Sequence, residues 1–137
     1  MSQSCCKYIL DTNVFVELLR TGNQNIAEKI RKIGISSCCI SDITLYELYC
    51  GAIYARNPEK EKERVKNICS NLEVIPISNH INSAINQKEY LKKNGTMIPD
   101  FDIMIGTTGV DNNYIVVTND SHYQFLQGII TEDWTKK

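Results

Sequence analysis

The stretch YILDTNVFVELL, residues 8–19, indicates the fold because its character changes within a few positions. An apolar run of three residues stops at the polar triplet Asp11-Thr12-Asn13. Apolar residues then recur at helical spacing, at Val14, Phe15, Leu18 and Leu19. This pattern predicts a strand that leads through a polar turn into a helix. Residues 35–55 repeat it, with a strand over 35–40, an N-cap at Ser41 or Asp42, and an apolar, largely buried helix from 43 to about 55.

The same alternation extends along the rest of the chain. Helices are predicted at residues 26–33, from Pro58 to about 66, from a Ser78 cap to Asn94, and at 101–110. Strands are predicted at 72–77, 114–117 and 128–130. This order predicts an α/β fold with a central, mostly parallel sheet flanked by helices. The 137 residues suit one domain, which we expect to span 1–137 with an ordered core at about 6–131.

The composition narrows the class of protein. With 42% apolar and 23% charged residues, the chain is not of the disordered type. No apolar stretch approaches the roughly 20 residues of a membrane helix, and the first apolar run is too short for a secretory signal. We therefore expect a cytoplasmic protein with no membrane partner. The six cysteines form no C-x-x-C motif, and we expect free thiols that pack as small apolar side chains.

Four acids occupy positions that single them out. Asp11 and Asp120 each follow a predicted strand, and parallel strands bring such residues to one edge of the sheet. Glu47 and Asp102 lie on apolar helices, where a carboxylate needs a partner. Thr44, one turn before Glu47, belongs to the same narrow polar stripe. The topology thus predicts that the four carboxylates converge.

Converging carboxylates without lysine or arginine neighbours repel one another and raise one another's pKa values. A divalent cation relieves this repulsion, and an all-oxygen set suits Mg²⁺ or Mn²⁺ rather than zinc. Such a site activates water for in-line displacement at a phosphodiester. Taken singly, the acids have simpler explanations, since Asp11 could cap a helix and Asp120 could shape a turn. His80 and His122 lack metal-ligand spacing, so we expect surface or hydrogen-bonded roles for them.

Gly106 and Gly109 lie on the same side of the predicted helix as Asp102. Each glycine costs roughly 1 kcal/mol in a helix interior, so a reason for their presence is expected. We predict that another element approaches the helix closely at these two positions.

Four blocks of the chain carry a family pattern. They are Tyr8-Ile9-Leu10-Asp11-Thr12-Asn13-Val14, then Ile40-Ser41 with Thr44 and Glu47-Leu48, then Ile98-Pro99-Asp100-Phe101-Asp102 with Ile105, and Val116-Val117-Thr118-Asn119-Asp120. In this order and spacing the chain resembles the PIN-domain ribonucleases, and more closely their VapC-like toxin branch. Each block alone is common, whereas four in order over nearly the whole chain are specific.

The resemblance implies a PIN-like three-layer sandwich and a Mg²⁺- or Mn²⁺-dependent endoribonuclease that acts on RNA. It also implies a homodimer and a toxin that an antitoxin protein holds inactive. Asp11 and Asp102 would be direct metal ligands, Glu47 would hold the metal or its water, and Asp120 would orient a water or a second ion. Supporting positions are implied at Asn13, Thr44, Asp100 and Thr118, with Asp100 either a fifth ligand or an outer acid.

The net charge has two interpretations. Fifteen basic and sixteen acidic residues give −1, which by itself disfavours a nucleic-acid partner. If four acids bind metal, twelve remain against fifteen basic groups, a formal +3 for the rest of the domain. Candidate RNA contacts are then Arg20, Lys29, Arg31, Lys32 and the basic residues of 60–66.

Two other functions fit the same residues less well. A receiver-like signalling module needs a second acid after the first strand and a suitable late lysine, which the chain lacks. A haloacid-type phosphatase needs an aspartate where Asn13 stands. Two alternatives within the resemblance stay open: an RNA-processing PIN nuclease that is not a toxin, and a non-catalytic RNA-binding scaffold.

Overall fold

The computed structural model describes residues 6–136 and has at its centre a five-stranded sheet in the order β3-β2-β1-β4-β5. The strands are β1 (Tyr8–Leu10), β2 (Cys38–Ser41), β3 (Glu73–Ile75), β4 (Ile115–Val117) and β5 (Thr131–Glu132). All neighbouring strands are parallel, as the alternation predicts. Leu10 of β1 pairs with Val117 of β4, so the carboxyl ends of these two strands lie side by side.

Helices connect the strands. The α-helices are α1 (Thr12–Thr21), α2 (Gln24–Ile33), α3 (Asp42–Ala52), α4 (Pro58–Cys69), α5 (Ile81–Asn94) and α6 (Asp100–Asn112). Short 3₁₀ helices are η1 (Ile35–Ser37), η2 (Ile77–His80) and η3 (Ser121–Phe125). Local caps agree with the sequence, since the Ser41 side chain accepts from Ile43 N at the start of α3 and Gly95 ends α5 with φ +67°.

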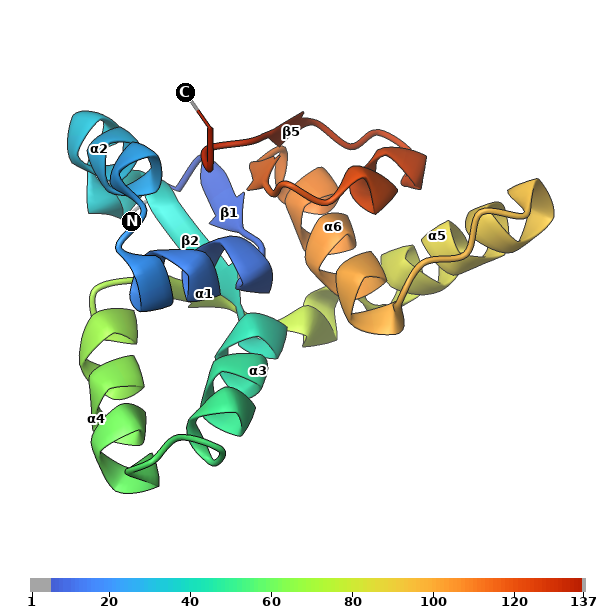
Figure 1. Cartoon of the computed structure of the whole chain (residues 1–137). Coiled ribbons are helices and arrows are strands. Elements are labelled where there is room, and N and C mark those ends of the chain that lie inside the picture. Colours follow the sequence, from blue (N-terminus) through green and yellow to red (C-terminus); the bar gives the residue numbers. More distant parts are fainter. Residues whose placement is uncertain (1–5, 137) are drawn as a thin grey trace.

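Two apolar cores cover the two faces of the sheet, because successive strand residues point to opposite sides. Ile9 and Val116 pack in one core with residues of α5, α6 and η3. Their neighbours Leu10 and Val117 pack in the other with residues of α1, α2, α3 and α4. Figure 1 shows these helices on either side of the strands. The structure thus has the predicted PIN-like three-layer α/β architecture.

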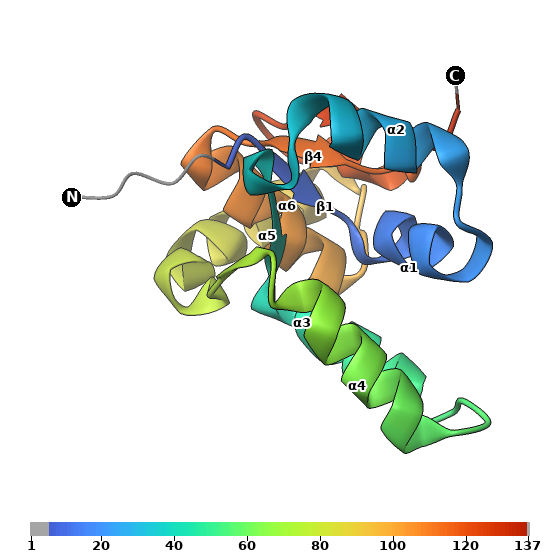
Figure 2. The same ribbon diagram turned by 90° about the vertical axis from the view of Figure 1, so that its left-hand side faces the viewer.

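The α3–α4 pair extends away from the sheet (Figure 2). For this reason the helix predicted over 43–55 is not buried all round, and it ends at Ala52. Tyr46 is 58% exposed and Ile53 is 52% exposed. The prediction of a largely buried helix was wrong here, because α3 packs against α1, α4, α6 and the sheet and leaves the rest of its surface exposed.

Three other predicted boundaries are corrected. Residues 35–37 form η1 rather than a strand, since Ser37 N donates to Gly34 O at 3.1 Å and closes a turn. Ser78 lies inside η2 and does not cap α5. The last strand lies at 131–132 rather than 128–130, because Gly128 adopts φ +79° and turns the chain. Trp134 is buried, so the core extends past residue 131.

Two further observations concern the length of the helices and the thiols. Within residues 6–136, no helix has the length and apolarity that crossing a membrane requires. The five cysteines of this range form no disulfide with one another, and all but the half-buried Cys50 are buried. Cys5, the sixth, lies outside the described residues.

Candidate active site

Asp11 lies at the junction of β1 and α1 and is only 2% exposed. Although it occupies the N-cap position of α1, its side chain makes no capping hydrogen bond. Its Oδ2 accepts from Thr118 Oγ1 at 2.9 Å, and its Oδ1 accepts from the Tyr123 hydroxyl at 3.0 Å. Burial raises the pKa of Asp11, while these hydrogen bonds and one from the Thr12 backbone act against the rise. The helix-cap explanation of Asp11 therefore does not hold.

Thr118 and Asp120 follow β4, at the edge of the sheet where β1 also ends. Thr118 Oγ1 donates to Asp11 and accepts from Asp120 N at 3.0 Å, so it links the two strand-end acids. The Asp120 carboxylate accepts from His122 N at 2.9 Å and lies 3.0 Å from His122 Nδ1. Asp120 thus shapes the turn into η3, as its simpler explanation predicts, while its charge also raises the pKa of Asp11.

Asp102 lies in the first turn of α6, within 3.4 Å of the Tyr123 hydroxyl. Its pKa is raised to about 6, first by burial and then by the negative charges of Asp11, Asp120 and Glu47. The structure therefore brings three acids from different segments of the chain near enough to Asp102 to raise its pKa.

Gly106 gives Tyr123 room beside α6. A Cβ at Gly106 would overlap the Leu126 side chain and lie 3.3 Å from Tyr123 Cδ1. At Gly109, a Cβ would lie 2.6 Å from Val116 Cγ2. The predicted close approach at both glycines is confirmed, and it is what sets the Tyr123 ring against the helix that carries Asp102.

Glu47 is positioned from α1. Thr12 Oγ1 donates to Glu47 Oε1 at 2.7 Å and lies 2.9 Å from Thr44 Oγ1. Because Thr12 uses its proton for Glu47, the Thr44 hydroxyl donates to Thr12. Thr44, which we predicted on the same stripe as Glu47, is therefore linked to Glu47 through Thr12 of α1.

Two expected supporting residues lie elsewhere. Asn13 is exposed on the first turn of α1, and among the described residues its side chain has no hydrogen-bond partner. Asp100 is exposed and pairs with Lys88 of α5, Oδ1 to Nζ at 2.9 Å. The structure thus gives Asp100 a partner outside the group of four acids.

Sequence reasoning missed Thr12, Tyr123 and His122 as neighbours of these acids. The sequence marks Thr12 only as part of a polar turn. Tyr123 belongs to a segment without helical or strand periodicity, so no pattern marked its ring as buried. The glycine at position 106 was the available signal, since it predicted that some element packs against the helix of Asp102.

The donor chemistry of the four acids fits Mg²⁺ or Mn²⁺. Within residues 6–136, none of them forms an ion pair with a lysine or arginine, and His122 is the basic partner of Asp120. Among the described residues, no three His, Cys, Asp or Glu side chains are arranged so that they could hold one metal ion. The acids would have to draw closer to coordinate one ion. The repulsion that raises the pKa of Asp102 is the condition that such an ion relieves.

Known proteins share this architecture. A family model described as the PIN domain matches residues 8–127. The tRNA(fMet)-specific endonuclease VapC of Salmonella typhimurium is 32% identical over 130 residues, which cover 93% of this chain and 98% of that protein. Ribonuclease VapC2 of Haemophilus influenzae is 28% identical with the same coverage.

Among solved structures, DNA-bound VapBC from Salmonella typhimurium contains a chain that superposes with a TM-score of 0.88 and 30% identity. The match covers 94% of this chain and 98% of that one. Since the family model spans most of the sequence and the fold agrees with it, the chain belongs to the PIN-domain family.

Proposed function

We propose that this protein is a metal-dependent endoribonuclease and the toxin of a toxin–antitoxin pair. The observation that carries the proposal is that Asp11 and Asp102 share the Tyr123 hydroxyl, while Asp120 and Glu47 lie close enough to raise the pKa of Asp102. Relatives named endonuclease and ribonuclease, aligned over nearly the full length, support the activity. The Salmonella structure that superposes on this chain is one of VapBC rather than of VapC alone, which supports a protein antitoxin as partner.

In the proposed mechanism, Asp11 and Asp102 would hold Mg²⁺ or Mn²⁺, and Glu47 would hold the ion or its water. The ion, when bound, supplies an acidified water and stabilises charge at the phosphodiester. The Thr118 and Tyr123 hydroxyls fix the two oxygens of Asp11. Thr12 sets the direction of Glu47. Asp120 orients a water or a second ion from the turn that His122 stabilises. We propose the cytoplasm as the compartment of this reaction, in keeping with an RNA substrate.

We also propose a homodimer. The exposed ring of Tyr46 on α3 lies edge-on to that of Phe101 on α6, with centroids 6.1 Å apart. These two rings, and Ile53 at the end of α3, are exposed apolar side chains of the kind that a second copy would cover.

The activity is tested with purified protein, total RNA, and Mn²⁺ or Mg²⁺, with Asp11→Asn as the matched variant. Cleavage by the wild type is expected to stop in EDTA and in the variant. Equal cleavage by both proteins would contradict the proposal. If calorimetry showed no Mn²⁺ binding by the wild type, the non-catalytic scaffold would replace the enzyme.

The toxin role has its own test. Brief induction of the chain in bacteria, followed by mapping of RNA 5′ ends, is expected to show new ends that the Asp11→Asn form does not produce. New ends without arrest of growth would favour an RNA-processing enzyme over a toxin.

A further inference from the structure

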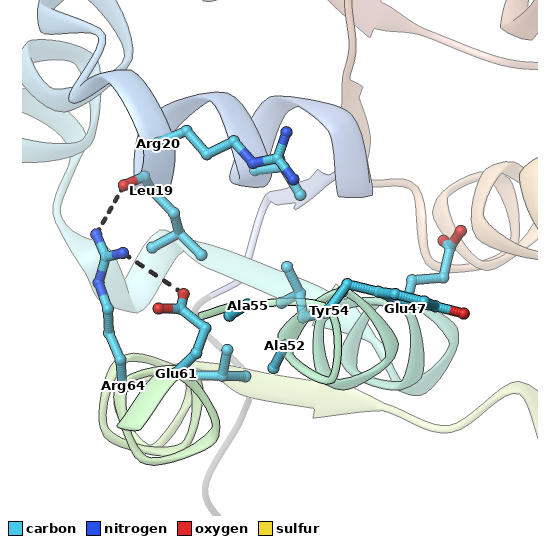
Figure 3. Close-up of a pocket in the computed structure, with 12 residues that line it drawn as sticks. Leu19, Arg20, Glu47, Ala52, Tyr54, Ala55, Glu61 and Arg64 are labelled. Atoms are coloured by element: carbon cyan, nitrogen blue, oxygen red, sulfur yellow. Dashed lines mark hydrogen bonds and ion pairs between the residues drawn. The ribbon is translucent and has the colours of Figure 1, made fainter. Parts of the chain in front are cut away.

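A cavity of about 350 Å³ lies between α1, α3 and α4, and Glu47 is the one of the four acids that lines it. Glu47 belongs to both places, since its side chain lines the cavity and also accepts from Thr12. Figure 3 shows the Glu47 carboxylate rising from α3 at one end of this space. A molecule in the cavity would therefore lie against a group that we assign to the cleavage site.

The two arginines that line the cavity differ in whether other groups of the protein bind their side chains. Arg64 of α4 donates to Leu19 O at 2.7 Å and lies 3.5 Å from Glu61 Oε1, so its charge is matched within the protein (Figure 3). Arg20, in the last turn of α1, is exposed and forms no hydrogen bond or ion pair with any of the described residues. Arg20 is thus a free cation at the wall of the cavity.

The side chain of Tyr54 is a second group at the cavity that has no hydrogen-bond or ring partner among the described residues. It follows the end of α3, lines the cavity and is 87% exposed, the largest exposed fraction among the large apolar residues of 6–136. In Figure 3, Arg20 reaches from α1 on one side of the cavity and Tyr54 lies on the other. An open aromatic face opposite an arginine suits a flat ring that carries an anion.

We propose that this cavity binds one nucleotide of a single-stranded RNA, next to the bond that is cut. The base stacks on the Tyr54 ring and its phosphate is bound by Arg20. Unpaired bases are commonly held by aromatic stacking, and arginine forms two parallel hydrogen bonds to a phosphate. The volume is in the range of small-molecule sites, and larger than a single side chain needs. The proposal rests on the endoribonuclease function and adds a substrate-positioning subsite to it.

The same groups argue against a purely apolar occupant. The carboxylate of Glu47 accepts a hydrogen bond from Thr12, and Glu61 is paired with Arg64. Arg20 is therefore the charged group of the cavity that has no partner among the described residues. An anionic ligand satisfies that charge, whereas an apolar segment would bury it without a partner.

The test measures RNA affinity in EDTA, by fluorescence anisotropy of a short, fluorescein-labelled, random-sequence RNA that cannot be cut without a divalent cation. Tyr54→Ala is expected to weaken binding roughly 5-fold or more, as the loss of one stacked base does, and Tyr54→Phe to restore it. Arg20→Gln is expected to weaken binding and to reduce the salt dependence by about one counterion.

Two exposed residues of α5 provide matched controls. Lys93→Gln removes one positive charge from the last turn of α5, and Tyr90→Ala removes a partly exposed ring. Both are expected to bind RNA as the wild type does. Equal RNA affinity of all the variants would overturn the subsite and would favour a protein segment as the occupant of the cavity.

Different experimental results would contradict the proposed subsite and the proposed enzyme activity. If the wild type cleaves RNA in Mn²⁺ but Arg20→Gln and Tyr54→Ala bind RNA as tightly as the wild type does, only the subsite is contradicted. Weakened binding by these two variants, with no cleavage by the wild type in Mg²⁺ or Mn²⁺, contradicts the enzyme alone.

Discussion

The Tyr123 hydroxyl donates to Asp11 Oδ1 at 3.0 Å and lies 3.4 Å from Asp102 Oδ1, so one buried group joins acids from β1 and α6. The ring itself is fully buried and packs beside Gly106. Burial and the two neighbouring carboxylates raise the pKa of Tyr123, so its proton stays in place as a donor throughout the physiological range. The relative position of the two acids thus depends on a side chain from a third segment, η3.

Tyr123→Phe keeps the ring and removes this donor. We expect the free energy of unfolding to fall by about 1–3 kcal/mol, because Asp11 keeps its burial and loses a hydrogen bond. The affinity for Mn²⁺ is expected to fall roughly 10-fold, as for other residues that orient metal ligands. Urea denaturation and calorimetric titration measure the two effects. Tyr90→Phe on α5 is the control, and unchanged Mn²⁺ affinity in Tyr123→Phe would show that the hydroxyl does not position the acids.

Thr12→Val tests the link between α1 and Glu47. The change frees Glu47 and leaves the fully buried Thr44 hydroxyl without its partner, so we expect a loss of about 1–2 kcal/mol in the free energy of unfolding. In the double variant with Thr44→Val, no buried hydroxyl is stranded, and the loss should be smaller than the sum of the single losses. Strictly additive losses in chemical denaturation would argue against the linked pair.

The raised pKa of Asp102 gives a pH dependence of defined sign. The folded state holds the proton up to about pH 6, whereas the unfolded chain releases it near the ordinary 3.8. Between these values the folded state binds more protons, so the stability of the metal-free protein falls as pH rises through this window. Asp102→Asn avoids that loss and should be more stable at neutral pH by about 1 kcal/mol, after allowance for solvent screening.

Thermal unfolding in EDTA across this pH range measures the effect. The advantage of Asp102→Asn should vanish below the ordinary pKa, where both side chains are neutral. Added Mn²⁺ should reverse the order at neutral pH, since it stabilises the wild type through the intact carboxylate. A wild type that is the more stable protein at neutral pH without metal would contradict the repulsion among the four acids.

Gly106→Ala tests the close approach of η3 to α6. The added methyl group meets Leu126 and Tyr123, and we expect a loss of about 1–3 kcal/mol in the free energy of unfolding together with weaker Mn²⁺ binding. Gly51→Ala is the matched control, since it also changes a helical glycine but has no atom within 4 Å of the new Cβ. That control should gain up to about 1 kcal/mol from helix propensity. A similar gain in Gly106→Ala would disprove the tight packing.

Much of the architecture could be derived from residue order. The run 8–10 followed by Asp11-Thr12-Asn13, and the run 115–117 followed by Thr118, are local patterns that encode a strand and its end. Parallel pairing of β1 with β4 then places Asp11 and Asp120 at one edge without further information. Side-chain periodicity also placed Glu47 and Asp102 on helices, where apolar neighbours marked each acid as unusual.

Contacts between distant segments were decided by packing. Tyr123 and Asp11 are 112 positions apart, and Thr12 and Glu47 are 35 apart, so no local period relates them. The exposed side of α3 also follows from where the α3–α4 pair leaves the sheet, and the cavity between Arg20 and Tyr54 is a consequence of that projection. Periodicity specifies which side of an element is apolar, whereas the partner of each side depends on how all the elements close around the sheet. The sequence therefore identified the four acids and Thr118, whereas only the tertiary structure identified Thr12 and Tyr123 as donors to these acids and formed the cavity beside Glu47.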